Sequence, residues 1–559
     1  MAAAEGVFDR DGAFPRLSED LIAPLDAVGV RRPLTAGDIL FEAGDRESAF
    51  YVVLRGRVAI IDAYGTKKER VLGVHEARRF VGELSLVTGQ PTYTTAVVRE
   101  DGEAIELTRE QLQAVVSANQ QLGDILLTAF MARRAILIGG GSGLRLIGSH
   151  LSPDCRRLRE FLTRNRIPHS FIDLEIYSDA ELLLQKLSVA PEETPLVLRG
   201  TKILRNPSNI EVAAALNLVP RATPAQVFDA VVVGAGPAGL GAAVYAASEG
   251  LSTALVDSVA IGGQASTSSR IENYLGFPAG ISGSELAERA AIQATRFGAD
   301  SAVPVQATRL TIEDGYHVVE LEGEERLRAR AVVLATGASY RRLSVSRLDE
   351  FEGAGVFYAA TEVEAQMCER SPVVVVGGAN SAGQAAVFLA RRVGRVSMLL
   401  RGGDLTKGMS RYLVDQVEGE PGIDVCLRTQ IRELHGNGDL QGVTVECDGE
   451  QRQIDARAVF VFIGADPCTE WLDDALAIDE DGFVLTGQSL TLTHLDPSGD
   501  GRERPPLPLE TSRPGVFAAG DVRSGSIKRV ASAVGEGAMA VRMIHQYLAL
   551  LDGAATRQL

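Results

Sequence analysis

The residues from Phe228 to Gly241, F-D-A-V-V-V-G-A-G-P-A-G-L-G, are the strongest indication of the fold of this chain. A run of valines ends in the glycine pattern Gly234-x-Gly236-x-x-Gly239, and the residues that follow are small and compatible with a helix. This order of strand, glycine turn and helix is typical of a βαβ unit that binds a dinucleotide. The first glycine allows the tight turn, the second lets the backbone approach a pyrophosphate, and the third lets helix and strand pack closely.

An acidic residue downstream supports this interpretation. Asp257 ends a second apolar run, at about the spacing of 20 residues at which such units place an acid that binds a ribose hydroxyl. The N-terminus of the intervening helix offers unpaired N–H groups and a positive dipole end to phosphates. A glycine turn without a ligand is the less favoured interpretation of the same residues.

The composition limits the class of protein. With 559 residues and 45% hydrophobic residues, the chain can form about three or four well-filled domains. A formal net charge of -17 argues against nucleic acid or an anionic membrane as the main partner. No apolar run reaches the roughly 20 residues that span a bilayer, and the N-terminus lacks the features of a secretory signal. The five cysteines share no C-x-x-C spacing, so we expect no metal site, no disulfide framework and a reducing, cytoplasmic setting.

The N-terminal region predicts a β-roll flanked by helices over residues 1–137. Residues 15–110 contain short β-type runs separated by Gly-Asp turn pairs, and residues 108–137 have helical periodicity. The motifs A-G-D-x-x-F-x-x-G-D, Y-V-V-L-x-G and F-V-G-E-L-S-L resemble those of the cyclic nucleotide-binding domain family. The resemblance covers about residues 15–135.

The last of these motifs opens the phosphate cassette of that family. The resemblance implies that Gly82 and Leu84 offer backbone N–H groups to a cyclic nucleotide and that Glu83 binds its ribose. Thr94, however, stands where the family has the arginine that binds the cyclic phosphate. Without this guanidinium the phosphate loses a charge-assisted bidentate contact. Cyclic nucleotide sensing and a degenerate domain used for assembly or docking therefore both remain open.

Residues 138–221 predict a second domain. After a glycine-rich linker, the pattern is strand, helix, strand, helix, strand, strand, helix. The turn S-P-D-C at 152–155 and the pair T-P at 194–195 resemble the thioredoxin-like, glutaredoxin-type domains, whose T-P bond is cis. Active members have a nucleophilic cysteine where this chain has Ser152, and only Cys155 remains, at the resolving position. A structural adaptor is favoured, and a mixed disulfide through Cys155 is the alternative.

From Phe228 almost to its C-terminus, the chain resembles the low-molecular-weight thioredoxin reductase family. The motifs follow in the expected order: G-G-Q-A at 262–265, E-N-Y and G-F-P within 272–278, V-V-L-A-T-G at 332–337, G-V-F-A-A-G-D at 515–521 and K-R-V-A at 528–531. The resemblance implies that these motifs bind FAD and that the last one tunes the flavin ring. The predicted FAD-binding residues are Gly234, Gly236, Pro237, Ala238, Gly239, Asp257, Gly263, Gln264, Asn273, Thr336, Gly337, Gly520, Asp521, Lys528, Arg529, Val530 and Ala531.

A second dinucleotide-binding unit begins at Pro372. Its valine strand leads into G-G-A-N-S-A at 377–382, where alanine replaces the second and third key glycines. After the next predicted strand comes Arg401, and a basic group at this position favours the 2′-phosphate of NADP. We expect NADPH, with NADH left open. The predicted NADP-binding residues are Gly377, Gly378, Asn380, Ser381, Ala382 and Arg401.

The chain departs from the thioredoxin reductase family at the catalytic dithiol. The family carries C-x-x-C just before the second dinucleotide strand, and alignment on Tyr358 and Thr361 puts Ala359 and Glu362 at the two cysteine positions. Cys368 lies downstream and alone, so a buried or incidental thiol is the favoured interpretation. The usual dithiol relay is therefore not available.

Together these patterns predict a multidomain α/β protein with two Rossmann-like domains behind a β-roll and a thioredoxin-like domain. The FAD-binding domain is expected in two parts, 222–340 and 466–559, around an NAD(P)-binding domain at 341–465. The resemblance implies a homodimer in which NADPH reduces FAD and FAD reduces an unidentified acceptor. That acceptor is a disulfide of a thioredoxin-like or other partner, Cys155 or Cys368, a quinone or oxygen. The alternative is a flavin-based or cyclic-nucleotide-responsive sensor with little turnover.

Overall fold

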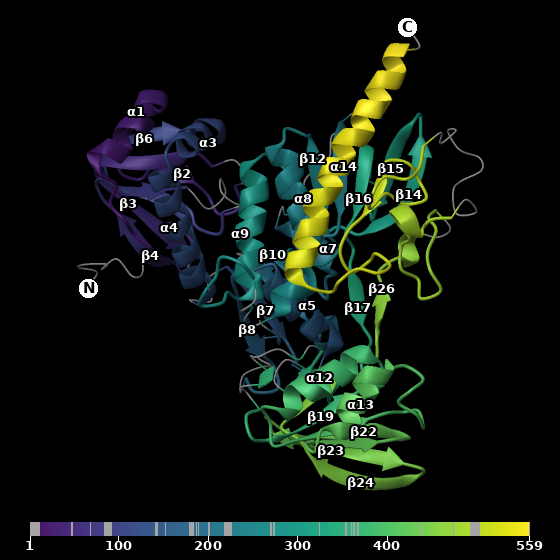
Figure 1. The fold of residues 1–559 in the computed structure, drawn as a ribbon. Helices are drawn as coiled ribbons and strands as arrows, with labels where there is room; N and C mark the ends of the chain where they lie inside the picture. Colours follow the sequence, from purple (N-terminus) through teal and green to yellow (C-terminus); the bar gives the residue numbers. More distant parts are fainter. Residues whose placement is uncertain are drawn as a thin grey trace. The chain divides into compact units, whose positions relative to one another are not determined.

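The structure of the chain is a computed structural model that forms two compact units. The first unit comprises residues 1–337 and 469–559, and the second unit comprises residues 338–468. The mixed α/β class predicted from the sequence is confirmed (Figure 1). The structure describes residues 12–557 except for 46–47, 67–68, 83–91, 140–142, 151, 178–183, 186, 188, 200–201, 217, 219–225, 269–270, 272–273, 324, 353–354, 359, 361–363, 366–367, 438, 473–474 and 492–503.

An antiparallel β-roll forms the N-terminal part of the first unit. Its strands pair in the order β1-β6-β3-β4, with β2 on β6 and β5 on β3. Helices α1, α3 and α4 of the described residues accompany it, and the predicted helical stretch breaks at Asn119, whose side chain accepts a hydrogen bond from the N–H of Leu122 at 3.1 Å. The elements are α1 (Glu19–Val28), β1 (Val30–Leu34), β2 (Ile39–Phe41), β3 (Phe50–Asp62), β4 (Arg70–His75), β5 (Phe80–Val81), β6 (Thr95–Leu107), α3 (Arg109–Ala118) and α4 (Gln120–Gly139).

A four-stranded sheet of order β10-β9-β7-β8 forms the middle domain. Strand β7 is parallel to β8 and antiparallel to β9, and the Thr194–Pro195 bond is cis. Ser208 caps the last helix through the N–H of Glu211, as its sequence position predicts. Most of the helix predicted at 179–187 lies outside the described residues. The elements are β7 (Leu144–Gly148), α5 (Pro153–Arg164), β8 (His169–Asp173), η1 (Pro191–Glu193), β9 (Leu196–Arg199), β10 (Lys202–Arg205) and α7 (Asn209–Ala215).

The rest of the first unit is built on a seven-stranded sheet of order β13-β12-β11-β16-β15-β14, with β27 on the other side of β16. Strands β13, β12, β11, β16 and β27 are parallel, whereas β14 and β15 form an antiparallel hairpin. The elements are β11 (Val227–Val233), α8 (Pro237–Ser248), β12 (Thr253–Val256), η2 (Gly263–Thr267), α9 (Gly283–Arg296), β13 (Asp300–Ala302), β14 (Ala307–Glu313), β15 (Tyr316–Leu321), β16 (Arg326–Leu334), η3 (Glu470–Leu472), η4 (Gly487–Ser489), β27 (Val516–Ala518) and α14 (Val530–Arg557).

Helices α8 and α14 pack together with unusually little space between their backbones (Figure 1). A Cβ atom at Gly537 of α14 would lie 2.1 Å from the carbonyl oxygen of Ala238 in α8. A side chain at Gly241 of α8 would in turn meet the backbone of Val534 at 2.9 Å. Small residues at these two positions let the C-terminal helix cover the first helix of the dinucleotide motif.

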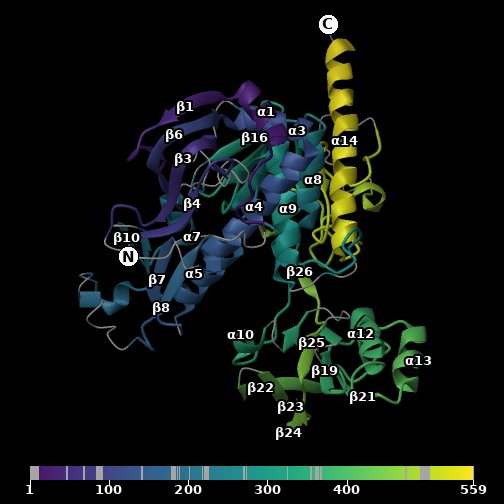
Figure 2. The same cartoon turned by 90° about the vertical axis from the view of Figure 1, so that its left-hand side faces the viewer.

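The second unit contains a parallel sheet of order β18-β25-β19-β20-β21 and an antiparallel sheet of order β22-β23-β24. Strands of both sheets are labelled in the turned view (Figure 2). A short two-stranded pair, β17 with β26, accompanies them. The elements are β17 (Ala338–Tyr340), α10 (Leu348–Phe351), β18 (Val356–Phe357), β19 (Pro372–Val376), α12 (Asn380–Ala390), β20 (Arg395–Leu399), α13 (Arg411–Gly419), β21 (Ile423–Cys426), β22 (Thr429–Asn437), β23 (Asp439–Cys447), β24 (Glu450–Asp455), β25 (Ala458–Val461) and β26 (Ala465–Pro467).

Candidate functional site

The turn between β11 and α8, residues 234–239, is called the glycine loop here. Gly234 has a φ of +108°, and a Cβ atom there would lie 2.2 Å from the carbonyl oxygen of Ala335. A Cβ atom at Gly239 would lie 1.7 Å from the carbonyl oxygen of Gly234, so no other residue fits either position. Gly236 is the N-cap of α8 and Pro237 its first residue. The N-terminus of α8 therefore lies in the glycine loop, where a diphosphate can approach its N–H groups.

Asp257 lies directly after β12 and holds the glycine loop in place. One carboxylate oxygen accepts the N–H of Ala235 at 2.8 Å, and the other accepts those of Val259 at 2.9 Å and Ala260 at 3.0 Å. Burial raises the pKa of Asp257, while these bonds and the charge of Arg164 act in the opposite direction. Because a carboxylate has about four acceptor sites, Asp257 can also accept a ribose hydroxyl.

The segment that begins at Gly262 packs against the glycine loop. The N–H of Gly262 donates to the carbonyl oxygen of Ala235 at 2.7 Å. Gly263 has a φ of +53°, and a Cβ atom there would lie 2.9 Å from the Cα atom of Gly236. Gln264 follows within η2, whereas Asn273 lies outside the described residues. The structure thus places the first two predicted FAD motifs side by side.

The carboxyl ends of three strands bring the other FAD motifs to the same edge. Leu334 of β16 pairs with Val233 of β11 on one side and with Ala518 of β27 on the other. Thr336 and Gly337 come just after β16, while Gly520 and Asp521 come just after β27. A Cβ atom at Gly520, whose φ is +77°, would lie 2.8 Å from the Cβ atom of Ala238 in the glycine loop. Ligands of open α/β sheets bind in the crevice at this edge.

Glu536 in α14 is a residue of this site that the sequence patterns did not identify. It accepts the N–H of Gly520 at 2.7 Å and forms two bonds with the guanidinium of Arg523, at 3.2 and 2.5 Å. Both side chains are largely buried, with 13% and 18% exposed. Glu536 therefore fixes the turn that carries Asp521. Burial raises the pKa of Asp521, and the charge of Lys528 opposes this shift in part. The only signal in the sequence is a single acid among the small residues V-A-S-A-V-G-E-G-A.

The N-terminus of α14 carries the last predicted FAD motif. Val530 and Ala531 are the first residues of this helix, and Lys528 and Arg529 immediately precede it and are exposed. The Lys528 ammonium lies 4.9 Å from the centre of the Phe483 ring. Free N–H groups, the helix dipole and two cations make this region favourable for negative charge.

The second glycine motif lies in the second unit, between β19 and α12. Gly377 has a φ of +143°, and a Cβ atom there would lie 2.3 Å from the carbonyl oxygen of Phe462. Ala382 is buried against this turn, while Gly378 and Ser381 lie nearer the surface. The side chain of Asn380 accepts the N–H of Ser410 at 2.8 Å. The first turn of α12 is thus available to a diphosphate, with alanine in place of the usual glycine.

Arg401 follows the end of β20 in the second unit. Its side chain is exposed, and none of the acids that the structure describes forms an ion pair with it. The nearest acid in the chain, Asp404, instead accepts the N–H and the hydroxyl of Thr406, both at 2.8 Å. The end of β20 therefore offers a cation and no acidic competitor to a ribose 2′-phosphate.

Both candidate thiols lie in hydrophobic cores. Cys155 is completely buried beside Pro195, and burial raises the pKa of its thiol to about 11. Cys368 has 2% of its surface exposed, and burial raises its pKa to about 11 as well. Because the thiolate is the reactive form, these environments disfavour electron exchange at either residue. The positions aligned with the family dithiol, Ala359 and Glu362, lie outside the described residues.

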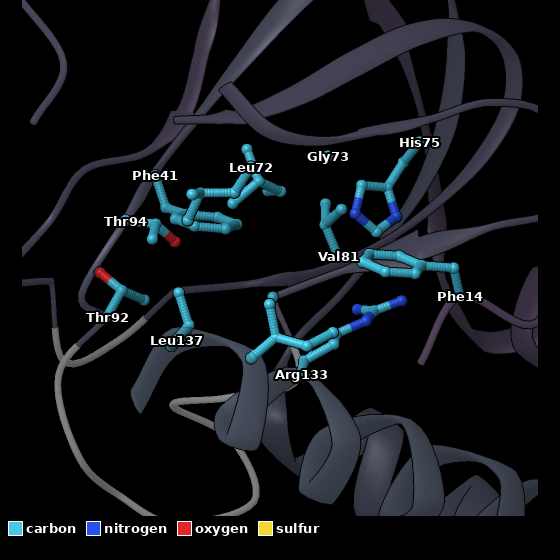
Figure 3. A pocket seen from close by; sticks show the side chains of 13 residues that line it. Phe14, Phe41, Leu72, Gly73, His75, Val81, Thr92, Thr94, Arg133 and Leu137 are labelled. Atoms are coloured by element: carbon cyan, nitrogen blue, oxygen red, sulfur yellow. The ribbon is translucent and has the colours of Figure 1, made fainter. Parts of the chain in front are cut away.

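A cavity in the N-terminal domain lies between the β-roll and α4 (Figure 3). Thr94 lines it, at the position where the cyclic nucleotide-binding family has arginine, and so does Gly82. Glu83 and Leu84 lie outside the described residues. Arg133 of α4 also reaches this cavity, but its guanidinium lies 4.6 Å from the centre of the Phe80 ring and donates to two backbone carbonyls. The cavity is therefore mainly apolar, with this one arginine engaged by the protein itself.

Two kinds of feature are missing from the part of the chain that the structure describes. In that part, no helix has both the length and the apolar character needed to cross a bilayer. Within the same residues, no three histidine, cysteine or acidic side chains gather into a site that could hold a metal ion.

Comparisons with known proteins agree with this geometry. The family described as pyridine nucleotide-disulphide oxidoreductase matches residues 228–537, and the family described as cyclic nucleotide-binding domain matches residues 31–119. The thioredoxin reductase of Treponema pallidum (strain Nichols) is 33% identical over 327 residues, which are 58% of this chain and 98% of that protein. The thioredoxin reductase of Mycolicibacterium smegmatis is 32% identical over 333 residues, or 59% of this chain and 99% of that protein.

A solved structure shows the same likeness. The crystal structure of thioredoxin reductase from Streptococcus pyogenes MGAS5005 has a TM-score of 0.50 and 29% identity, and it covers 58% of this chain and 99% of that protein. The match to the pyridine nucleotide-disulphide oxidoreductase family includes both glycine motifs and spans more than half of this chain. The chain therefore belongs to the pyridine nucleotide-disulphide oxidoreductase family, as a thioredoxin reductase-like oxidoreductase with an N-terminal cyclic nucleotide-binding domain.

Proposed function

We propose that this protein is an FAD-dependent oxidoreductase that takes electrons from NADPH and passes them to an acceptor outside its own chain. The observation that carries the proposal is the shared edge of β11, β16 and β27, where the glycine loop, Asp257 and Asp521 meet. Backbone that only glycine can adopt, helix N–H groups and carboxylates fit the diphosphate and hydroxyl groups of FAD. When bound there, FAD supplies the hydride and electron chemistry.

In this proposal, the residues of the chain bind the two dinucleotides, orient them and tune the flavin ring. The glycine loop holds the diphosphate, and Asp257 and Asp521 accept hydroxyl hydrogens of the ribose and ribityl groups. The N-terminus of α14, with Lys528 and Arg529 beside it, stabilises negative charge on the ring. Arg401 selects NADPH over NADH through the 2′-phosphate.

The acceptor is proposed to be external because neither candidate thiol, Cys155 or Cys368, is accessible in the described part of the chain. The sequence has no C-x-x-C, and Cys155 and Cys368 are buried with raised pKa values. A disulfide on a thioredoxin-like partner, a quinone and oxygen fit the remaining chemistry. The wider proposal is a cytoplasmic homodimer in which the middle domain acts as a thioredoxin-like adaptor, and the strand order β10-β9-β7-β8 supports this part of the proposal.

The decisive experiment is an anaerobic titration of the flavin-loaded protein, first with NADPH and separately with NADH, following the oxidised flavin absorbance. Rapid bleaching near one equivalent of NADPH is expected, with slower bleaching or a higher requirement for NADH. If neither nucleotide reduces the flavin, the reductase proposal is wrong. If NADPH does reduce the flavin, the acceptors are compared by steady-state turnover with a disulfide protein, a quinone and oxygen.

A sensor with little turnover is the second candidate function. It is favoured by the changed residues at three positions where the related families have reactive or ligand-binding groups, namely Thr94, Ser152 and Ala359. In such a sensor, the cavity beside Thr94 would bind the signalling ligand. The redox state of the flavin would be either the output or a second signal. Turnover with every acceptor slower than about one per minute, despite fast reduction by NADPH, would favour this candidate over the enzyme.

A further inference from the structure

Two consecutive residues at the end of helix α5 of the middle domain reach the flavin site. Arg164, the last residue of α5, donates a hydrogen bond from Nη2 to the carbonyl oxygen of Gly263 at 3.3 Å. Asn165, the C-cap, donates from Nδ2 to the carbonyl oxygen of Val259 at 2.9 Å. Both acceptors belong to the segment after β12 that packs on the glycine loop.

These contacts put a cation beside the diphosphate-binding loop. A Cβ atom at Gly263 would be 2.9 Å from the Cα atom of Gly236, the N-cap of α8. The positive charge of Arg164 is also close enough to Asp257 to lower the pKa of that carboxyl, against the stronger effect of burial. Arg164 is therefore near both groups that are expected to meet the diphosphate and the ribose of a bound dinucleotide.

A buried ionic cluster holds this end of α5 in place. Arg166 pairs with Glu288 of α9 and donates to Ser284 of the same helix at 3.1 Å. Arg134 of α4, from the N-terminal domain, lies 3.6 Å from the same carboxylate and donates to the carbonyl oxygen of Arg166 at 3.2 Å. The side chains of Arg134 and Glu288 are only 5% and 9% exposed. Breaking such a buried pair on one side leaves an uncompensated charge.

The cluster joins the three parts of the first unit at one carboxylate. The contact between Arg134 and Glu288 joins α4 to α9, and both helices are labelled in Figure 2. All three arginines precede residue 228, where the match to the oxidoreductase family begins. The family fold alone therefore supplies neither the guanidinium near the glycine loop nor the cluster that positions it.

We propose that Arg164 is a flavin-binding residue contributed by the middle domain, which contacts the diphosphate group or the adjacent ribose of FAD. The proposal rests on the FAD site described under Proposed function. A planar guanidinium can hold a carbonyl and a phosphate oxygen together, and such charge-assisted bonds are shorter and stronger than neutral ones. Retention of flavin then depends on the docking of the middle domain, with Arg166, Glu288 and Arg134 as positioning residues.

The test compares Arg164→Gln with Arg159→Gln in the full-length protein. Arg159 lies on the same helix, is exposed and stacks over Phe171 at 4.4 Å within the middle domain, so its change leaves the flavin site untouched. Each protein is stripped of flavin and titrated with FAD, and the Kd is measured from the change in flavin fluorescence at several salt concentrations. We expect Arg164→Gln to raise the Kd about tenfold and to weaken its dependence on salt, because a charged contact is lost. Arg159→Gln should match the wild type, and Arg164→Lys should recover part of the affinity.

Docking and direct contact are separated by hydrogen exchange across α9 and residues 259–263. Glu288→Gln should increase exchange there, whereas Arg164→Gln should lower affinity with little change in exchange. The inference is overturned if Arg164→Gln binds FAD as the wild type does at every salt concentration. It is also overturned if Arg164→Gln loses affinity only together with the same exchange increase as Glu288→Gln, since docking alone would then explain the loss. If the wild type itself does not bind FAD, the proposed function fails, which is a different result from equal binding by both proteins.

Discussion

Replacing Glu536 with glutamine should loosen the turn that carries Asp521 without changing the shape of the site. The glutamine oxygen can still accept the N–H of Gly520, but the two charge-assisted bonds to Arg523, at 3.2 and 2.5 Å, lose their anionic partner. Hydrogen bonds to charged groups contribute about 1.5–3 kcal/mol, and breaking a fully buried ion pair costs about 3–5 kcal/mol. Because Arg523 keeps 18% of its surface exposed, water offsets part of the loss.

We therefore expect a loss of about 2 kcal/mol at this turn, which corresponds to a roughly 30-fold higher Kd for FAD if the turn orders on binding. The assay is the temperature at which flavin fluorescence appears on heating, together with the Kd at 25 °C. Asp552→Asn is the matched control. Asp552 lies on α14, as Glu536 does, and pairs with Arg330, but its side chain is 68% exposed, and exposed ion pairs contribute little to stability. If Glu536→Gln releases flavin at the same temperature as Asp552→Asn, the role assigned to Glu536 is refuted.

Three further predictions concern the other sites. Arg401→Ala should raise the KM for NADPH about tenfold and leave that for NADH nearly unchanged, and an equal effect on both would rule out a 2′-phosphate contact at this residue. His317 is buried, which lowers its pKa to about 4. Between about pH 4 and pH 6.5, the unfolded chain therefore binds a proton at His317 that the folded protein does not bind. Stability is then complete above about pH 6.5 and falls by up to about 3 kcal/mol toward pH 4, and His317→Gln should flatten that part of the curve of flavin-release temperature against pH. In the native protein, a thiol reagent followed by mass spectrometry should label the exposed Cys468 within minutes but Cys155 and Cys368 only on unfolding, and early labelling of either buried thiol would contradict the assigned cores.

The local parts of the fold could be predicted from the sequence because their constraints are local. Gly234 and Gly239 are required by contacts within the strand-turn-helix unit itself, and the pattern of glycines records those contacts directly. Ser208 likewise caps a helix through a residue three positions away. The helical pattern over residues 108–137 forms two helices that meet at Asn119, because the side-chain cap there interrupts a helix although the apolar periodicity continues across it.

The parts that could not be predicted depend on residues far apart in the chain. Arg164 meets Gly263, and Arg134 meets Glu288, only after three domains have docked. Glu536 stabilises a turn that lies before its own helix, so nothing near it in the sequence reveals a partner. Burial of Cys155 was also not predictable, since the turn S-P-D-C has the same appearance whether its thiol is exposed or buried in a hydrophobic core.

The close packing of α14 on α8 has a consequence for the nascent chain. Strand β11 and helix α8 leave the ribosome before the second unit, whereas β27, which extends their sheet, and α14, which covers α8, follow the second unit in the chain. The second unit, residues 338–468, is complete before then and can fold as a unit, because domains generally fold one at a time during synthesis. The proposed flavin-binding edge is therefore completed only after the second unit has been translated, and we expect translation products that end before Val516 to bind no FAD.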